Sequence, residues 1–402
     1  MSAAAASPAR RSPLLAPPLT DPGAPAHGAV EASGPEAGVA AHYGRPVPEQ
    51  RALGRGRALV DLSSRTVLSV SGPDRLAWLH TLSSQHLADL TPGTSTEALF
   101  LDANGRIETA VHLLEDGAAA WLIVDAPHAE ALTGWLRSMV FSHDVVLRDH
   151  SAAVAVVGAM APVPGWEDRT VWLDPWPQVA EGGWSYGVAP QEHPGADWSW
   201  REYLVTCEDL ARTVAGLGQG ELTGWSLAGT EAAEALRIAA GRPRPALDAD
   251  ARALPHELDL LRTAVHLAKG CYRGQETVAR VHNLGRPPRR LTQLLLDGST
   301  HTLPEAGAAV VVRPDPDTPE ARAAARPVGT VTSAARHHEA GPVALALLKR
   351  AVPVDAPLLV REQAAQGGQP APESWIAAAQ EPLVLPEAGQ VVGRPAGLGR
   401  RH

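Results

Sequence analysis

Cysteine and lysine are scarce in this chain of 402 residues, which contains two of each. Two isolated cysteines cannot form a disulfide framework, and neither lies in a CxxC or Cys/His pattern typical of zinc or iron–sulfur sites. The chain also lacks a run of about 20 apolar residues that could span a membrane. We therefore expect a protein of the reducing cytoplasm, with no metal site and no membrane partner.

An excess of basic residues is also missing. The formal net charge is -9 at pH 7, and no block of Lys and Arg is long enough to reverse that sign locally. The balance argues against a general nucleic-acid-binding protein, so we expect no nucleic-acid partner. Hydrophobic residues make up 45% of the chain and charged residues 20%, which is ordinary for a globular protein with an ample core.

The composition and the order of the predicted elements divide the chain into five parts. Residues 1–45 lack hydrophobic periodicity, which predicts a disordered extension. Residues 46–150 mix short strands with helices as an α+β sheet domain does, and residues 151–285 begin a second such unit. Residues 286–362 alternate short strands with Pro/Gly/Asp turns, which is typical of a small β-barrel. Residues 363–402 are rich in Pro, Gly and Ala and are expected to form a mostly flexible tail.

Hydrophobic periods and turn residues place the individual elements. The Asn104-Gly105 pair predicts a hairpin turn. Thr230 is typical of a helix N-cap and Gly241 of a helix end. Strands are expected at 58–62, 66–70, 98–101, 107–114, 119–124, 145–147, 202–206, 290–296, 308–313, 328–333, 343–348 and 358–361, and helices from Pro73, at 127–139, 210–217 and 230–240, and from Gln275.

One lysine, one cysteine and one of the four tyrosines fall within four positions, and the segment 269–280 has the sequence KGCYRGQETVAR. Cys271 therefore has cationic neighbours, which stabilise a thiolate, and Gly270 and Gly274 permit a sharp turn around it. The helix expected from Gln275 would favour a thiolate further through its N-terminal dipole. The alternative is a buried cysteine that acts as a small hydrophobe. We expect that second behaviour of Cys207, which follows an apolar strand.

Three other segments leave alternatives open. The Trp residues of segment 166–200 could contact a flat ligand or pack under a long loop. The segment His337-His338-Glu339 could bind a metal, but adjacent histidines on a strand point to opposite faces, which favours a solvated turn. The arginines of segment 286–290 could attract phosphate or a polyglutamyl tail, or form a charged linker into the barrel.

The segment 269–280 resembles the signature of the YgfZ-type folate-binding proteins, a branch of the superfamily that includes the glycine-cleavage aminomethyltransferases. The similarity extends over roughly 53–360, with the helix start at 72–75, the hairpin 101–107 and the helix 234–241 in the family's order. The resemblance implies a ring of three domains, two mixed α+β sheet domains and a C-terminal small β-barrel. In that superfamily tetrahydrofolate sits in the central hole of the ring.

The function that the resemblance implies is that of a tetrahydrofolate-binding accessory protein, which helps to assemble or repair iron–sulfur clusters in client enzymes. Its contacts with those clients would be transient. The roles implied for the signature residues are a reactive thiol for Cys271, stabilisation of the thiolate for Lys269 and Arg273, loop shaping for Gly270 and Gly274, and folate binding for Tyr272, Gln275 and Arg280.

Two positions depart from the family pattern. The aminomethyltransferases carry an Asp pair just after the hairpin, where this chain has Ile107-Glu108-Thr109-Ala110, and Ala239 stands where relatives often have Glu. The missing carboxylate weakens the case for a tetrahydrofolate-dependent aminomethyltransferase and leaves open whether the protein is an enzyme. A non-catalytic folate-binding scaffold or sensor is the other alternative. A thiol-dependent hydrolase would need a His–Asp pair, and none is recognisable near the signature.

Overall fold

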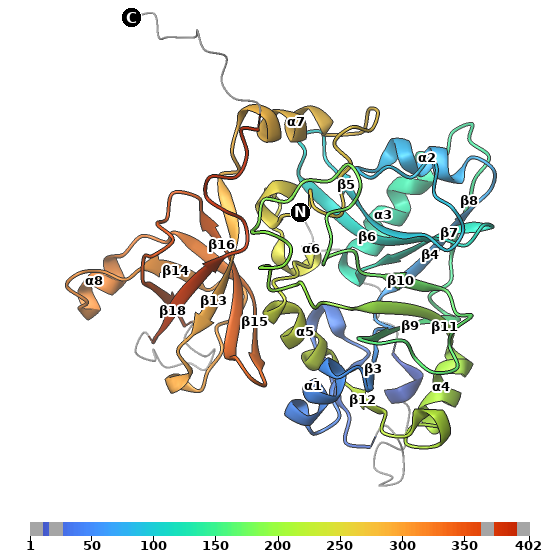
Figure 1. The fold of residues 1–402 in the computed structure, drawn as a ribbon, viewed down its shortest axis with the longest axis horizontal. Coiled ribbons are helices and arrows are strands. Elements are labelled where there is room, and N and C mark those ends of the chain that lie inside the picture. Colours follow the sequence, from blue (N-terminus) through green and yellow to red (C-terminus); the bar gives the residue numbers. More distant parts are fainter. Residues whose placement is uncertain (1–10, 16–26, 363–373, 392–402) are drawn as a thin grey trace, which may run out of the picture.

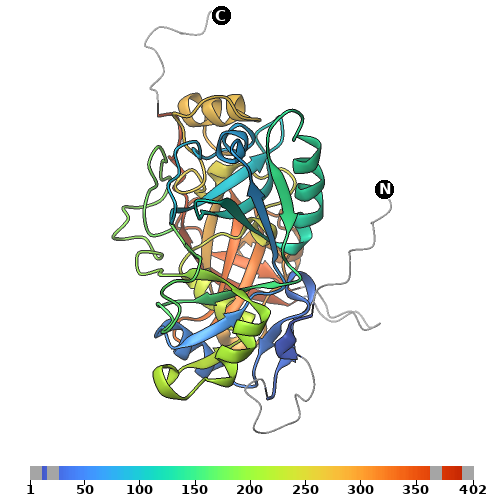
Figure 2. The same cartoon turned by 90° about the vertical axis from the view of Figure 1, so that its right-hand side faces the viewer.

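The computed structural model describes residues 11–15, 27–362 and 374–391. Two five-stranded sheets and a closed six-stranded barrel make up the architecture, and helices cover the outer faces of the sheets (Figure 1). Seen after a turn of 90°, the two sheets lie one above the other with the barrel behind them (Figure 2). This arrangement confirms the predicted α+β class with a C-terminal barrel.

The first sheet is antiparallel throughout, and helices α2 (Arg75–Leu82) and α3 (Ala126–Ser138) pack against one face of it. Leu79 of α2 and Leu136 of α3 are fully buried against its strands because their helices place apolar residues three or four positions apart. The strand order is β5 (Ser95–Leu101), β6 (Ile107–Glu115), β7 (Ala119–Val124), β4 (Thr66–Ser71) and β8 (Val146–Asp149).

The second sheet has one parallel pair, β3 with β12, and is otherwise antiparallel. Helices α1 (Pro46–Gly54), α4 (Cys207–Ala215) and α5 (Thr230–Ala239) pack on it. A shared core joins it to the first sheet, with Val60 from one sheet and Ile123 from the other. The strand order is β10 (Val171–Leu173), β11 (Arg201–Thr206), β9 (Val154–Ala159), β3 (Ala58–Asp61) and β12 (Ser226–Ala228).

The sequence places β3 and β4 side by side in one unit, whereas the structure places them in different sheets. The turn 62–65 carries the chain from one sheet to the other. All four residues of β3 and the four central residues of β4 are buried. Strands buried on both faces show no alternation, so the sequence does not indicate which strands they pair with.

The barrel closes through a strand that lies in the predicted flexible tail. Strand β18 (Trp375–Pro382) pairs with both β13 and β17, and its Ile376 is buried in the barrel core. Its run of alanines has a low β-propensity and did not predict a strand. Hydrogen bonding to a neighbouring strand on each edge stabilises it as a strand nevertheless. The order around the barrel is β13 (Arg289–Leu296), β16 (Gly341–Lys349), β15 (Gly329–His337), β14 (Ala309–Val312), β17 (Leu358–Arg361) and β18.

Part of the predicted N-terminal extension is ordered as well. Strands β1 (Val30–Glu31) and β2 (Ala40–His42) pair, and Val39 beside β2 is fully buried. The segment docks on the start of α5, where Thr230 donates a hydrogen bond to the Ala40 carbonyl. The buried stretch is only a few residues long, so it shows no period that a sequence pattern could reveal.

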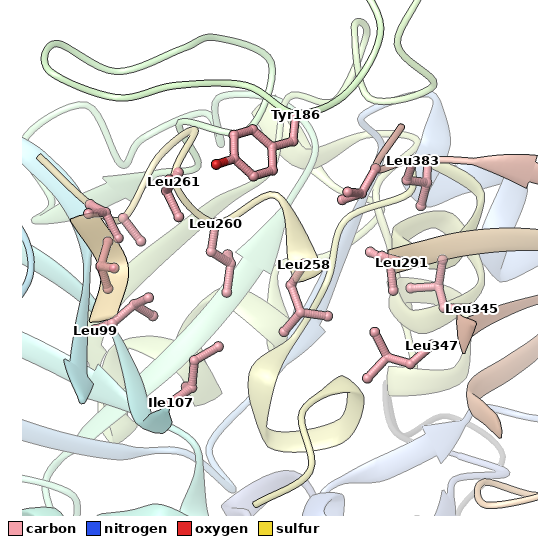
Figure 3. Close-up of a cluster of buried hydrophobic side chains, with 14 of the residues drawn as sticks. Leu99, Ile107, Tyr186, Leu258, Leu260, Leu261, Leu291, Leu345, Leu347 and Leu383 are labelled. Atoms are coloured by element: carbon pink, nitrogen blue, oxygen red, sulfur yellow. The ribbon is translucent and has the colours of Figure 1, made fainter. Parts of the chain in front are cut away.

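The two sheets and the barrel meet around a leucine-rich linker. Helix α6 (Pro245–Asp248) and the 3-10 turn Pro255–Leu258 lead into a stretch whose Leu258, Leu260 and Leu261 are fully buried. These side chains fill the space between Leu99 and Ile107 of the first sheet and Leu345 and Leu347 of the barrel (Figure 3). The remaining elements are α7 (Gln275–Leu284), α8 (Pro319–Ala324) and the short 3-10 turns Pro13–Leu15, Gly34–Glu36, Gly220–Leu222 and Gly298–Thr300.

Neither a metal site nor a membrane span is found in the described part of the chain. No group of three or more His, Cys, Asp or Glu side chains there is arranged to hold a metal ion. His337 and His338 lie at the end of β15, where His337 Nδ1 accepts hydrogen bonds from the backbone of the following turn. Among the described helices, none has both the length and the apolar composition needed to cross a bilayer.

Candidate functional site

The signature segment forms a loop that leads into α7 and lies against the β5–β6 hairpin. Gly274 precedes the helix with φ +83°, a conformation that glycine adopts at little cost. A Cβ atom at this position would lie 2.6 Å from the Asp102 carbonyl oxygen, so the backbones approach too closely for any other residue. At Gly270 no atom of the described residues lies within 4 Å of such a Cβ, so this position does not require glycine in the same way.

Cys271 lies exposed on this loop, and its Sγ makes no hydrogen bond within the described ranges. The other cysteine, Cys207, is partly buried at the start of α4, and its Sγ lies 4.0 Å from the Ala152 carbonyl oxygen. The two thiols therefore differ in access. A solvent reagent or a partner protein can reach Cys271 directly.

Lys269 is turned away from solvent and holds the end of α2. Its side chain is only 5% exposed, and its Nζ donates to the backbone carbonyls of His80, Ser83 and Gln85, the last two at 2.6 and 3.1 Å. Burial lowers the pKa of the Lys269 ammonium to about 8. No hydrogen bond joins it to the Cys271 thiol. The bonds of Lys269 therefore suit an anchor of the loop better than a group that stabilises a thiolate.

The other signature residues occupy three different environments. Arg273 forms an ion pair with Glu108 at 2.9 Å, and both side chains are more than 40% exposed. Tyr272 is buried, which raises the pKa of its hydroxyl, and the Lys269 ammonium lies 5.1 Å from its ring centroid. Gln275 donates to the Lys269 carbonyl at 3.3 Å. Arg280 is exposed on α7 and lines neither of the two cavities described next.

A groove of about 730 Å³ opens beside the signature loop. Phe100 and Trp135 give it an aromatic wall, with ring centroids 5.6 Å apart, and Arg106 and Arg273 bring cationic groups to it. Its volume falls within the roughly 300–1,000 Å³ of small-molecule sites. The remaining lining residues are Asp102, Ile107, Glu108, Thr109, Pro127, His128, Ala131, Leu132, Pro245, Ala249, Asp250 and Ala251.

A central cavity between the two sheets and α5 is filled by a network of ion pairs. The open space left inside it is about 50 Å³, which is enough for a few water molecules but far too small for the fused rings of a folate. Four arginines, Arg65, Arg237, Arg242 and Arg244, pair there with seven carboxylates, Glu36, Glu97, Asp125, Asp174, Glu202, Glu234 and Asp248.

This network joins all three structural units. Arg242 bridges Glu97 of the first sheet at 2.9 Å and Asp174 of the second at 3.0 Å. Asp248 of α6 accepts a hydrogen bond of 2.6 Å from Ser333 of the barrel. Burial alone would raise the pKa of Glu202, but the Arg65 guanidinium beside it outweighs burial and holds that pKa well below its usual range.

Two of the tryptophans in segment 166–200 border this cavity. Trp198 donates to Asp174 at 2.8 Å and Trp200 to Glu202 at 2.9 Å, and their rings stack with centroids 5.7 Å apart. Trp172 and Trp176 are fully buried in the core between the sheets. Packing therefore accounts for most of the aromatic residues of this segment.

Comparisons with known proteins agree with this architecture. Over 258 residues the chain is 29% identical to a protein of Klebsiella pneumoniae (strain 342) named tRNA-modifying protein YgfZ. This match spans 62% of this chain and 74% of the relative. A protein of the same name from Shigella dysenteriae serotype 1 is 25% identical over 334 residues, or 79% of this chain and 94% of the relative. No family model matches the chain.

A solved structure has the same fold over nearly the whole chain. The glycine cleavage system aminomethyltransferase T from Bartonella henselae superposes with a TM-score of 0.64 over 88% of this chain and 93% of that one, at 17% identity. The chain is similar to YgfZ proteins in sequence and has the fold of an aminomethyltransferase.

The aminomethyltransferases carry an Asp pair just after the hairpin, and this chain lacks it. The corresponding positions lie where the groove meets the central network of ion pairs. Thr109 lines the groove and Ala110 lines the central cavity. Glu108 alternates with Thr109 along β6 and is exposed, so it shares a face with Ala110 and His112. Its carboxylate is already paired with Arg273.

Several residues of the site carried no signal in the sequence. Glu36 comes from the segment that was predicted to be disordered, yet it pairs with Arg244 in the central cavity. Arg242 and Arg244 stand in an Arg-Pro-Arg-Pro stretch, where strict alternation with proline was the one available sign of a fixed, extended backbone. Arg65 lies in the turn between β3 and β4, and only the structure shows its carboxylate partners.

Proposed function

We propose that this chain binds a folate-type ligand in the groove beside the signature loop. We further propose that it uses the exposed thiol of Cys271 in the assembly or repair of iron–sulfur clusters in client enzymes. The observation that carries the proposal is the position of Cys271, exposed and free of hydrogen bonds among the described residues, on a loop that borders a ligand-sized groove.

The chemistry of the groove suits tetrahydrofolate, which combines a flat ring system with carboxylates. Trp135, backed by the buried Phe100, offers an aromatic surface to the ring, and Arg106 and Arg273 offer guanidinium groups to the carboxylates. The central cavity holds buried carboxylates that could accept hydrogen bonds from a pterin, but its small open volume admits no ring unless side chains move. We therefore assign the ligand to the groove, with its ring near Thr109.

The loop is built to present Cys271 at a fixed place. Lys269 on one side of the thiol is held by three backbone carbonyls, and Gly274 on the other side is locked against the hairpin. A thiol between two anchored points keeps its position relative to the groove while remaining reachable by a partner. This favours a role in transfer or transient ligation over a role in packing.

The aminomethyltransferase alternative is weaker at the same site. General acid–base catalysis at a folate nitrogen needs a positioned carboxylate, and the positions after the hairpin hold Thr109 and Ala110. A folate-binding scaffold or sensor, with no use for the thiol, is the second candidate. The exposure of Cys271 argues against it, because a cysteine kept only for packing is normally buried.

The names of the relatives describe tRNA-modifying proteins, and we carry this link over as part of the proposal. Loss of the chain is then expected to change the level of tRNA modification in the cell. The link concerns the outcome of the activity and is separate from the question of whether the protein itself contacts RNA.

Calorimetric titration with tetrahydrofolate, combined with alkylation of the native protein, tests the proposal. We expect saturable binding to the parent protein and to Cys271→Ser, and much faster alkylation of Cys271 than of Cys207. Absence of binding would overturn the folate assignment. Equal alkylation rates at the two cysteines would support the scaffold alternative instead.

A further inference from the structure

A small hollow on the surface gathers three arginines at the C-terminal end of α1. Its volume is about 350 Å³, and its lining residues are Pro48, Arg51, Ala52, Arg55, Arg57 and Gly224. All three arginine side chains are exposed. Within residues 11–15, 27–362 and 374–391, none of their guanidinium groups forms an ion pair or a hydrogen bond, whereas the arginines of the central network are all paired.

The backbone beneath these arginines is fixed. Gly56 adopts φ +67°, and a Cβ atom there would lie 2.5 Å from the Ala161 Cβ, so the turn tolerates only glycine. Both backbone groups of Arg57 are hydrogen-bonded. Its N–H donates to the Ala52 carbonyl at 2.8 Å, and its carbonyl accepts from the Ser226 N–H at 3.1 Å. The hollow therefore presents its charges from a rigid surface.

The placement of these charges has an energetic cost that an anion would offset. Like charges four residues apart on a helix, such as Arg51 and Arg55, repel each other and destabilise the helix. The negative end of the helix dipole compensates for part of this repulsion. It does not account for the convergence of a third arginine, from beyond the helix, on the same hollow in a chain of net charge -9.

We propose that this hollow binds phosphate groups of an RNA backbone. Guanidinium groups match phosphate oxygens in pairs, and side chains four residues apart on a helix are separated by about 5–6 Å, so the hollow can engage neighbouring phosphates of one strand. Contacts of this kind carry no base specificity. The net negative charge of the whole protein makes the binding local, weak and sensitive to salt.

This inference departs from the expectation, drawn from net charge, that the chain has no nucleic-acid partner. It rests on the tRNA-linked part of the proposed function. Helix α1 and helix α7 lie at opposite ends of the molecule (Figure 1). The hollow is therefore a docking contact at a distance from the Cys271 loop, and it takes no part in thiol chemistry.

A charge-matched pair of variants tests the inference with labelled bulk tRNA as the probe. The triple variant R51Q/R55Q/R57Q removes the charges of the hollow. The control R137Q/R148Q/R326Q removes three exposed arginines that are scattered over the surface. Fluorescence anisotropy at several salt concentrations measures the affinity, and thermal unfolding verifies that both variants are folded.

We expect the hollow variant to lose at least tenfold in affinity at low salt and its salt slope to fall by about 2 to 3, as the loss of three phosphate contacts predicts. The control should change little. No binding of tRNA by the parent protein, or equal losses in both triple variants, would overturn the inference. Selective loss of polyglutamate binding without loss of tRNA binding would assign the hollow to an acidic protein instead.

Failure of this test leaves the proposed function standing, because the titration uses purified RNA and does not involve the thiol. A failure of the proposed function would be seen in a different measurement. In that case Cys271→Ser would have no effect on tRNA modification in cells, whatever the affinity of the hollow.

Discussion

Gly274 and Gly105 lie back to back where the signature loop meets the β5–β6 hairpin, and a Cβ atom on Gly274 would lie 2.7 Å from the Gly105 Cα. Replacing Gly274 by Ala combines this overlap with a left-handed φ that alanine avoids. We expect Gly274→Ala to lower the free energy of unfolding by about 2–3 kcal/mol. Urea denaturation measures the loss.

Gly270→Ala is the matched control, since this glycine has open space around it and no left-handed φ. It should change the free energy of unfolding by less than about 0.5 kcal/mol. Equal effects of the two substitutions would show that the contact with the hairpin does not hold the loop.

Lys269 anchors the same loop through its three hydrogen bonds to the end of α2. Methionine keeps the apolar stem but leaves the three carbonyls without their donor. We therefore expect Lys269→Met to cost about 2–4 kcal/mol in the free energy of unfolding, while the alkylation rate of Cys271 under native conditions stays within about twofold.

Lys349 is the other lysine of the chain, and among the residues that the structure describes its exposed Nζ donates only to the Pro327 carbonyl. Lys349→Met should leave stability nearly unchanged. A large drop in the Cys271 alkylation rate in Lys269→Met, with stability preserved, would show that Lys269 acts on the thiol after all.

The Arg273–Glu108 pair at the groove predicts effects of opposite sign on folate binding. A ligand carboxylate would compete with Glu108 for the Arg273 guanidinium. Arg273→Gln should weaken tetrahydrofolate binding by about 3- to 10-fold, and Glu108→Gln should strengthen it by a smaller factor, as expected for solvent-exposed charges worth about 1 kcal/mol.

Titration calorimetry measures both affinities, with Arg137→Gln on the outer part of α3 as the control. Changes of the same sign in Arg273→Gln and Glu108→Gln would place the folate carboxylates elsewhere. An unchanged affinity in both variants would show that the groove is not the folate site.

His256 makes the stability of the fold depend on pH. It is fully buried beneath α7, its ring lies 3.1 Å from the Val278 carbonyl, and burial lowers its pKa to about 3. The unfolded chain takes up this proton near pH 6.5 and the folded chain does not, so the free energy of unfolding falls as the pH falls below about 6.5.

The part due to His256 should reach about 2 kcal/mol by pH 5. His256→Gln, which cannot titrate, should lose less stability between pH 7 and pH 5 than the parent, while the exposed His143→Gln should lose as much. Urea midpoints at the two pH values decide this. Parallel losses in His256→Gln and the parent would show that other groups carry the acid sensitivity.

Local patterns in the sequence predicted the elements that local physics determines. The Asn104-Gly105 turn and the helix from Gln275 follow from turn and capping preferences, and the structure contains both. The barrel strands followed from short apolar runs between turns, apart from β18, whose alanines carry no strand preference. The exposure of Cys271 agreed with its polar and glycine-rich neighbours.

Partnerships between distant segments could not be predicted from the same patterns. Lys269 was assigned to the neighbouring thiol, but its partners lie about 185 residues earlier in the chain. Arg280, predicted to bind folate, is exposed and does not line the groove, so its role stays a prediction. Glu36 and Arg244 are paired only because the N-terminal segment folds back onto α5, a tertiary choice that no local preference encodes.

The role of the Cys271 thiol is tested by the activity of an iron–sulfur enzyme in cells that lack this protein and carry Cys271→Ser or Cys207→Ser in its place. Both replacements should fold and bind tetrahydrofolate. We expect Cys207→Ser to restore the enzyme activity and Cys271→Ser to leave it lost. Full restoration by Cys271→Ser would show that the thiol is not needed for iron–sulfur cluster assembly or repair.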